Sequence, residues 1–298
     1  MQKPKVIAIV GPTASGKTSL SIDIAKKFNG EVISADSRQV YTGLNIGSGK
    51  VTTEEMDGVP HHLLDVTAPT NVYTAADWQR DAQAALLDIQ KRGLCPVIAG
   101  GSFFYLDQLR GKSSTAPVEP NEQLRGELEL LPAEALFEKL QIADPARAET
   151  IDAHNKRRII RALEIVDALG SVPTETSPES PYDWLVLGVD LSKETLHSNI
   201  HIRLIERMKD GMVDEAKRLH AEGVSFERMN DLGLEYRYLA KLLKGELPED
   251  EMVTELETKI RQFAKRQMTW LKRDDEIEWY APKDREAIFR RVAEFLAE

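Results

Sequence analysis

The chain has 298 residues, of which 42% are hydrophobic and 30% are charged, and its formal net charge is −10. This composition is ordinary for a globular protein of one domain with an insert, or of two domains. No apolar run approaches the ~20 residues that span a bilayer, so we expect no membrane protein. The negative net charge argues against non-specific binding of nucleic acid by the whole surface, but it does not exclude local basic surfaces.

Two features concern the compartment. Cys95 is the only cysteine, so we expect neither an internal disulfide nor a cysteine metal cluster, which suits a reducing cytoplasm. Met1-Gln2-Lys3-Pro4 leads straight into a predicted strand, so we expect no secretory signal. We therefore expect a cytoplasmic location, and the acidic surface fits a soluble monomer.

The first predicted elements enclose a phosphate-binding motif. An apolar run at 5–10 predicts a buried strand, and apolar residues at 20, 24 and 28 predict a helix. Backbone N–H groups and a helix N-terminus present partial positive charge, Lys17 adds a full one, and Thr18 is placed to bind Mg²⁺. The motif predicts a polyphosphate site without specifying the polyphosphate. It matches G-x-x-x-x-G-K-[ST] in the required setting, and it reads Gly11-Pro12-Thr13-Ala14-Ser15-Gly16-Lys17-Thr18.

A second predicted strand, 31–35, leads directly to Asp36. Ligands of open α/β sheets bind beyond the carboxyl ends of the strands, so Asp36 is expected in the same crevice as the phosphate loop. The alternative is an Asp that caps the next turn. The glycine-rich stretch 42–50 has no helical period and predicts an active-site loop.

The alternation of elements continues up to residue 110. We predict a strand over 60–66, where His61 and His62 would point to opposite faces and so make poor co-ligands of a metal. A helix over 73–92, a strand over 95–99 and a helix over 103–110 follow. The series predicts an α/β fold, namely a parallel sheet with helices on both faces.

A helical segment then interrupts the sheet. Residues 111–120 and 170–181 have the Ser, Pro and Gly content of linkers. We therefore predict a helical insertion domain, 113–181, within a core made of 1–112 and 182–298. The helices expected in this insert are 122–130, 132–141, 145–152 and 155–169.

The sheet is expected to resume with a strand over 184–189, and the rest of the chain is predicted to be helical. Arg203 and Arg207 share one face of the first helix after that strand, so both are candidates for completing a diphosphate site. The helices predicted here are 196–211, 214–222, 235–244, 249–271 and 285–296, with an irregular stretch over 226–234.

Two basic clusters stand out in this acidic chain. One contains Arg157, Arg158 and Arg161, and the other, on the helix predicted over 249–271, includes Lys265 and Arg266 beside Trp270. Phosphate-backbone contact with a nucleic acid is one interpretation, and a solvated helix face is the other.

Six motifs follow one another along the chain: residues 11–18, Asp36-Ser37-Arg38-Gln39-Val40-Tyr41, Pro60-His61-His62-Leu63-Leu64-Asp65, Gly100-Gly101, Arg158-Ile159-Ile160-Arg161-Ala162-Leu163-Glu164 and Ala264-Lys265-Arg266-Gln267-Met268-Thr269-Trp270. In this combination the chain resembles the bacterial tRNA dimethylallyltransferases, or tRNA isopentenyltransferases, over about residues 5–280. The resemblance implies a P-loop NTPase-like core with a helical insertion domain that contacts the tRNA anticodon stem-loop.

The resemblance also implies an activity. A dimethylallyl group would pass from dimethylallyl diphosphate to N6 of the adenosine 3′ to the anticodon (tRNA position 37), in tRNAs that read codons beginning with U, and diphosphate would be released. Asp36 would act as general base. Thr13, Lys17 and Arg207 would stabilise the departing diphosphate, held by residues 11–18 with Mg²⁺ on Thr18. Ser37, Arg38 and Gln39 would hold the flipped-out adenine. The implied tRNA-binding residues are Asp36, Ser37, Arg38, Gln39, Ser102, Arg157, Arg158, Arg161, Lys265 and Arg266.

Some positions depart from the usual family pattern, yet none of them removes Thr13, Lys17, Thr18 or Asp36. Three other functions are alternatives: a small-molecule kinase on the same core, a prenyltransferase acting on free adenine nucleotide, and a non-catalytic nucleic-acid-binding module. The departures are Tyr41-Thr42-Gly43, Ser48-Gly49-Lys50-Val51, Ser102-Phe103-Phe104-Tyr105 and Gly233-Leu234-Glu235-Tyr236-Arg237.

Overall fold

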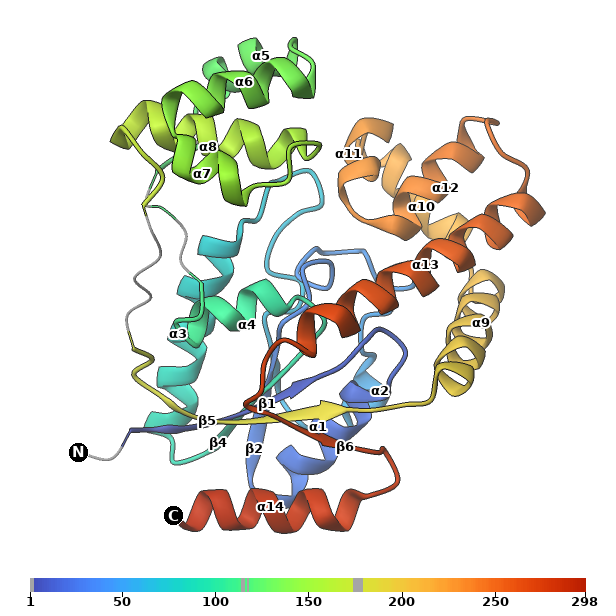
Figure 1. Cartoon of the computed structure of the whole chain (residues 1–298). Helices are drawn as coiled ribbons and strands as arrows, with labels where there is room; N and C mark the ends of the chain where they lie inside the picture. Colours follow the sequence, from blue (N-terminus) through green and yellow to red (C-terminus); the bar gives the residue numbers. More distant parts are fainter. Residues whose placement is uncertain (1–2, 114–115, 117, 174–178) are drawn as a thin grey trace. The chain divides into compact units, whose positions relative to one another are not determined.

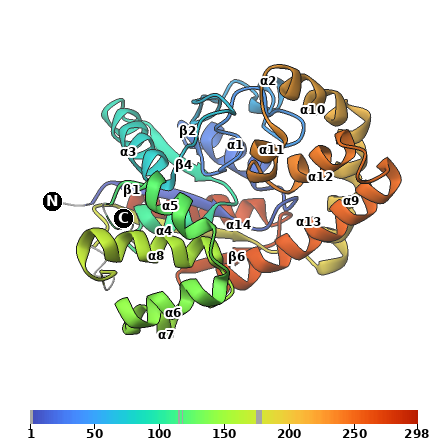
Figure 2. The same cartoon turned by 90° about the horizontal axis from the view of Figure 1, so that it is seen from above.

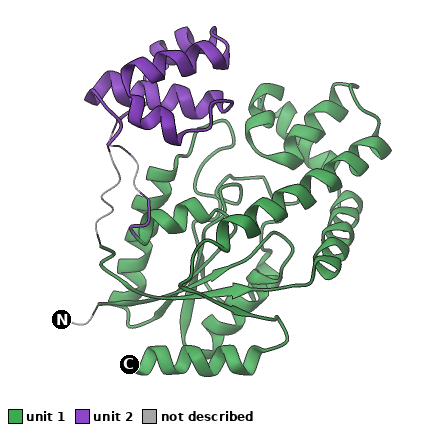
Figure 3. Ribbon diagram, in the orientation of Figure 1, with its two compact units in different colours: residues 1–110, 179–298 green, residues 111–178 purple. Residues whose placement is uncertain are grey.

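The computed structural model describes residues 3–113, 116, 118–173 and 179–298. These form two compact units (Figure 3): unit 1 comprises Met1–Arg110 and Glu179–Glu298, and unit 2 comprises Gly111–Pro178. The sequence prediction put these boundaries at 113 and 181. Parts of both predicted linkers lie outside the described residues. No helix in the described part of the chain has the length and hydropathy needed to cross a bilayer.

A six-stranded sheet forms the centre of unit 1, in the order β3-β2-β4-β1-β5-β6. Every pairing in it is parallel. The central strand β1 is buried on both faces, as its apolar, β-branched run predicts. The strands are β1 (Lys5–Val10), β2 (Gly30–Ser34), β3 (His61–His62), β4 (Cys95–Ala99), β5 (Asp183–Val189) and β6 (Ile277–Tyr280).

Helices cover both faces of this sheet (Figures 1 and 2), which confirms the predicted fold class. On one face, α1 (Lys17–Lys27) and α14 (Arg285–Ala297) pack against the strands. On the other, α3 (Ala75–Lys91) and α4 (Phe103–Leu109) do so. The remaining helices of unit 1 are α2 (Thr53–Met56), α9 (Lys193–Lys209), α10 (Met212–Ala221), α11 (Phe226–Asp231), α12 (Leu234–Leu243) and α13 (Glu249–Leu271).

Unit 2 is built from helices around a small core of its own. Leu136, Leu140 and Ile159 are fully buried there. Glu164 is also buried, and its carboxylate accepts hydrogen bonds from the Asn121 N–H and from Arg125. The helices agree with the predicted ones to within a few residues at each end: α5 (Glu122–Glu129), α6 (Ala133–Ala143), α7 (Pro145–Thr150) and α8 (Lys156–Leu169).

Three predicted elements were wrong. The strand predicted over 60–66 is only two residues long, since Leu63 and Asp65 adopt positive φ and turn the chain away. The stretch predicted to be irregular, 226–234, contains α11, whose first turn is capped by the Ser225 side chain. The C-terminal region is not wholly helical, because β6 pairs with β5 at the edge of the sheet.

Glu31 on β2 joins three elements at the other end of the sheet from the phosphate loop. Its buried carboxylate accepts two hydrogen bonds from Arg92, at 2.6 and 2.7 Å, and lies 2.7 Å from Nε2 of His62. The hydrogen bonds from Arg92 lower the pKa of Glu31 to about 2, against the opposing effect of burial. The histidine pair is therefore tied into the fold through His62.

We expect Glu31→Gln to lower the free energy of unfolding by about 3 kcal/mol at pH 7, the equivalent of a pKa lowered from 4.5 to about 2. Because the folded-state pKa is depressed, this stability is complete above pH 4.5 and is lost as the pH falls towards 2. Urea unfolding at several pH values measures it. As a control, Asp88→Asn removes an exposed partner of the same arginine and should cost under ~1 kcal/mol. A pH-independent difference between Glu31→Gln and wild type would contradict the assignment.

Candidate active site

One pocket of unit 1, about 450 Å³ in volume, lies at the carboxyl ends of β1, β2 and β4. It is lined by the phosphate loop, by the loops after β2 and β4, and by residues of α9, α12 and α13. The sequence prediction that Asp36 shares a crevice with the phosphate loop agrees with this geometry. The lining residues with charged or carboxamide side chains are Lys17, Asp36, Arg38, Gln39, Arg203, Arg207, Glu235, Arg237 and Gln267.

The phosphate loop is held from several sides. Lys17 Nζ donates a hydrogen bond to the Pro12 carbonyl at 2.6 Å, and Asn199 Nδ2 of α9 donates to the Ala14 carbonyl at 3.1 Å. The buried Ser15 hydroxyl has no hydrogen-bond partner among the described residues, so the loop contains a polar group that could hydrogen-bond a ligand. Of the predicted diphosphate-binding residues, Thr13, Ala14, Lys17 and Thr18 line the pocket, whereas Gly11, Pro12, Ser15 and Gly16 complete the loop without lining it.

Five cationic side chains line this pocket, and three of them, Lys17, Arg203 and Arg207, influence one another's charge; the other two are Arg38 and Arg237. Burial, and then the charge of Arg203, lower the pKa of Lys17 to about 7. Burial, and then Arg207, lower the pKa of Arg203 to about 10. A bound anion would relieve this crowding of positive charge, so the pocket suits a multiply charged anion.

Asp36 caps the turn after β2 and also lines the pocket, so the capping role and the place in the crevice that the sequence offered as alternatives are both observed. Its Oδ1 accepts hydrogen bonds from the N–H of Arg38 at 2.8 Å and of Gln39 at 3.4 Å. The neighbouring Ser37 N–H donates to Oγ of Ser102 at 3.0 Å, which links the loops after β2 and β4. The two hydrogen bonds to Oδ1 fix the direction of the Asp36 carboxylate at the edge of the pocket.

The glycine-rich loop 42–50 contributes Ser48 and Gly49 to the pocket. A Cβ at Gly49 would overlap the guanidinium of Arg207, and its φ of +61° is unfavourable for other residues. Arg207 in turn lies 3.8 Å from the carboxylate of Glu235 at the start of α12. Burial raises the pKa of Glu235, and the nearby Arg207 opposes that shift. The close approach of Arg207 therefore requires glycine at 49.

Aromatic side chains supply an apolar wall. Phe103 and Phe104 of α4 line the pocket together with Phe263 of α13. Phe103 is buried, whereas Phe104 and Phe263 are partly exposed. The pocket thus has a polar, cationic end at the phosphate loop and aromatic surface from α4 and α13.

The predicted tRNA-binding residues fall into separate places. Ser37, Arg38, Gln39 and Ser102 line the pocket with Asp36. Lys265 and Arg266 are exposed on α13 and do not line it. Arg157, Arg158 and Arg161 belong to unit 2, on α8. Arg161 is engaged inside that unit, because it donates to the Val118 carbonyl at 2.6 Å and pairs with Glu164 at 3.3 Å.

Sequence reasoning assigned no role to Gln267, Glu235 or Phe263, which all line the pocket. For Gln267 a signal existed. The buried stripe of α13 runs through Leu256, Ile260, Ala264, Gln267 and Leu271, and a polar residue in such a stripe needs a hydrogen-bond partner. Nothing local in the sequence marks Glu235 or Phe263.

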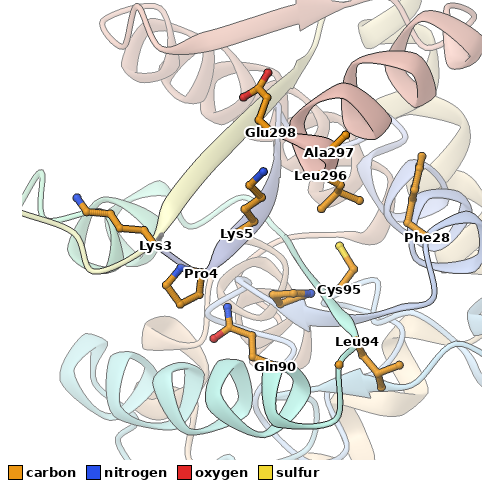
Figure 4. A pocket seen from close by; sticks show the side chains of 12 residues that line it. Lys3, Pro4, Lys5, Phe28, Gln90, Leu94, Cys95, Leu296, Ala297 and Glu298 are labelled. Atoms are coloured by element: carbon orange, nitrogen blue, oxygen red, sulfur yellow. The ribbon is translucent and has the colours of Figure 1, made fainter. Parts of the chain in front are cut away.

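A second hollow, about 560 Å³ in volume, lies at the amino-terminal ends of β1 and β4 (Figure 4). Lys5 beside it already donates to the Phe295 carbonyl. Burial raises the pKa of the Cys95 thiol to about 11, which makes it a poor nucleophile. This hollow therefore lacks the convergent polar groups of the pocket at the phosphate loop.

The parallel sheet and the phosphate loop after β1 define an α/β protein of the P-loop class, and its crevice adds a carboxylate to a set of cations. A family model described as IPP transferase matches residues 39–274. The chain is 37% identical over 292 residues to the tRNA dimethylallyltransferase of Halalkalibacterium halodurans, covering 95% of this chain and 92% of the relative. It is 40% identical over 285 residues to that of Thermomicrobium roseum, covering 94% and 86%.

Two solved structures are similar to this one. One is the full-length tRNA isopentenylpyrophosphate transferase from Bacillus halodurans, with a TM-score of 0.75, 36% identity and coverage of 98% of this chain and 96% of that one. The other is a eukaryotic dimethylallyltransferase acting on tRNA, with a TM-score of 0.78, 28% identity and coverage of 90% and 70%. The chain belongs to the IPP transferase family, which confirms the resemblance drawn from its motifs.

Proposed function

We propose that the protein transfers a dimethylallyl group from dimethylallyl diphosphate to N6 of the adenosine 3′ to the anticodon, in tRNAs that read codons beginning with U, with release of diphosphate. Membership of a family of tRNA-prenylating enzymes supports the class of reaction. The observation that carries the proposal is one crevice that holds Asp36 together with Lys17, Arg203 and Arg207. Such a crevice combines a base with a site for an anionic leaving group.

The cationic end would receive the diphosphate of the donor. The allylic C–O bond breaks with both electrons leaving on diphosphate, so negative charge grows on that group in the transition state. Lys17 and Arg207 would stabilise this charge, and the Thr13 hydroxyl would hydrogen-bond the departing bridging oxygen. The low pKa of Lys17 without an anion, about 7, is consistent with a site that needs a negative ligand.

Mg²⁺ is part of the proposal. Thr18 is exposed at the first turn of α1 and lines the pocket. No three acidic, His or Cys side chains of the described residues group into a metal cage. This donor set fits Mg²⁺ that is held by the Thr18 hydroxyl, water and substrate phosphate oxygens. Bound there, the ion would neutralise charge on diphosphate.

The acceptor would enter from the side of Asp36. An enzyme that acts on a base must extract it from its stack, and the pocket offers Ser37, Arg38 and Gln39 as polar contacts and Phe104 as an aromatic one. The N6 amine is a weak nucleophile because its lone pair is delocalised into the ring. As the bond between N6 and the allylic carbon forms, the N6 nitrogen would lose a proton to the carboxylate of Asp36.

The assay is direct. Wild-type protein is incubated with dimethylallyl diphosphate, Mg²⁺ and an unmodified tRNA that reads codons beginning with U, and the nucleosides are then analysed. We expect N6-dimethylallyladenosine and stoichiometric diphosphate. Folded protein that forms neither product would refute the proposal. Free AMP and ATP are offered in parallel, since turnover of either would favour a nucleotide prenyltransferase or a kinase.

The basic residues of α8 support a tRNA-binding role for unit 2. Arg158 is exposed on α8, and its backbone N–H donates a hydrogen bond to the capping side chain of Asn155. We expect Arg158→Ala to weaken tRNA binding and to make the slope of log K against log salt shallower by about 1, because one phosphate contact is lost. Binding is measured by filter retention at several salt concentrations.

The control for that variant is Lys91→Ala, which removes the same charge from an exposed position at the end of α3. It should leave both the dissociation constant and the salt slope unchanged. Equal salt slopes for Arg158→Ala and wild type would show that Arg158 contacts no phosphate.

A further inference from the structure

We propose that Gln267 is a positioning residue that sets the spacing between the phosphate loop and the loops that would hold the adenine. The inference rests on the proposed function for the chemical roles of those loops. Gln267 lies on α13, and only 6% of its surface is exposed. It does not belong to the set of cations and acids described above, and its role follows from the groups that its carboxamide joins.

Both ends of the Gln267 carboxamide are used. Oε1 accepts a hydrogen bond from the backbone N–H of Thr13 at 2.8 Å, and Nε2 donates to the Gly101 carbonyl at 3.0 Å. Thr13 belongs to the phosphate loop after β1, and Gly101 follows β4. One side chain therefore ties together two loops that are far apart in the sequence.

The connection continues from Gly101 to the candidate base. Ser102 N–H donates to the Ala35 carbonyl at 3.0 Å, and Ser102 Oγ accepts from Ser37 N–H at 3.0 Å. Asp36 lies between those two partners in the chain. The path from the phosphate loop to Asp36 thus passes through the Gln267 carboxamide and the loop after β4.

The carboxamide itself is held firmly. Leu256, Ile260, Ala264 and Leu271 of α13 pack into the core around the same helix face. A Cβ on Gly101 would stand 2.8 Å from Nε2, so the loop after β4 touches the carboxamide directly. A buried side chain with both ends bonded on a rigid helix is suited to fix a distance.

The expected consequence is specific to the chemical step. Transfer needs the allylic carbon and the N6 nitrogen within about 3–3.5 Å, and a misplacement of 1 Å can cost ~10²-fold in rate. Each substrate would contact its own loop whether or not the two loops are joined. Loss of the carboxamide should therefore lower the transfer rate far more than it lowers either affinity.

The first test is Gln267→Met, which keeps an unbranched side chain of similar length and removes both hydrogen bonds. We expect the single-turnover rate to fall by about 10- to 100-fold. Dissociation constants for inorganic diphosphate and for an anticodon stem-loop RNA should change by less than about threefold. Gln262→Met, at an exposed position of the same helix, is the matched control and should behave as wild type.

A second variant changes Gly101, the partner of the Gln267 carboxamide in the loop after β4. Gly101→Ala inserts a methyl group against Nε2, and Gly101 does not need positive φ, so the backbone is not strained. It should lower the transfer rate in the same way. In the double variant the two losses should not add, because both act on one contact. Additive losses would overturn the proposal.

Amide hydrogen exchange supplies a readout that needs no substrate. The Thr13 amide should exchange about fivefold faster, or more, in Gln267→Met than in Gln262→Met, because its acceptor is gone. An unchanged transfer rate, or losses of affinity as large as the loss of rate, would overturn the proposal. A wild type without transfer activity would instead refute the proposed function, while faster Thr13 exchange would still be expected.

Discussion

Asp36→Asn is expected to lower the rate of dimethylallyl transfer by about 10²- to 10⁴-fold, the usual contribution of a general base. Asparagine retains an oxygen that can accept from the N–H groups of Arg38 and Gln39, so the turn after β2 should persist. Its amide cannot take the proton of the N6 amine. The single-turnover rate on unmodified tRNA measures the effect.

Measuring the binding of the anticodon stem-loop distinguishes a loss of the chemical step from a loss of the folded site. Asp36→Asn should bind the anticodon stem-loop within about threefold of wild type, because most of the polar contacts of the pocket remain. Asp57→Asn is the matched control, since Asp57 is an exposed cap of α2 outside the pocket. Transfer by Asp36→Asn at near the wild-type rate would show that another group accepts the proton.

Lys17→Met is expected to lower the transfer rate by about 10²- to 10³-fold, as the loss of one donor to a developing anion does in other enzymes. The affinity for inorganic diphosphate should fall as well, because the pocket loses the positive charge that belongs to the phosphate loop itself. Stopped assays give the rate, and calorimetry gives the dissociation constant.

Lys26→Met serves as the control, on the same helix but exposed and paired with Asp57. It should leave rate and affinity unchanged. If Lys17→Met binds diphosphate as tightly as wild type and transfers at the wild-type rate, the phosphate loop does not hold the leaving group.

The sequence by itself determined the parts of this protein that local pattern encodes. The phosphate loop, with the strand over 5–10 before it and a helix after it, could be predicted because glycine spacing and apolar periodicity are properties of neighbouring residues. Asp36 could be placed in the same crevice because parallel strands end at one edge of a sheet. The helical insert followed from linker composition at its two ends, and the family followed from six motifs in a fixed order.

Only the tertiary structure decided the contacts between distant segments. Gln267 meets Thr13 and Gly101 across more than 160 positions of the chain, and no local pattern specifies such a pairing. The same holds for Arg207 against Gly49 and Glu235. β6 was not predicted because an edge strand of four residues, of which only Ile277 is buried, carries too little periodicity. Local forces select helices and strands, whereas the distances within a site are set by packing between elements.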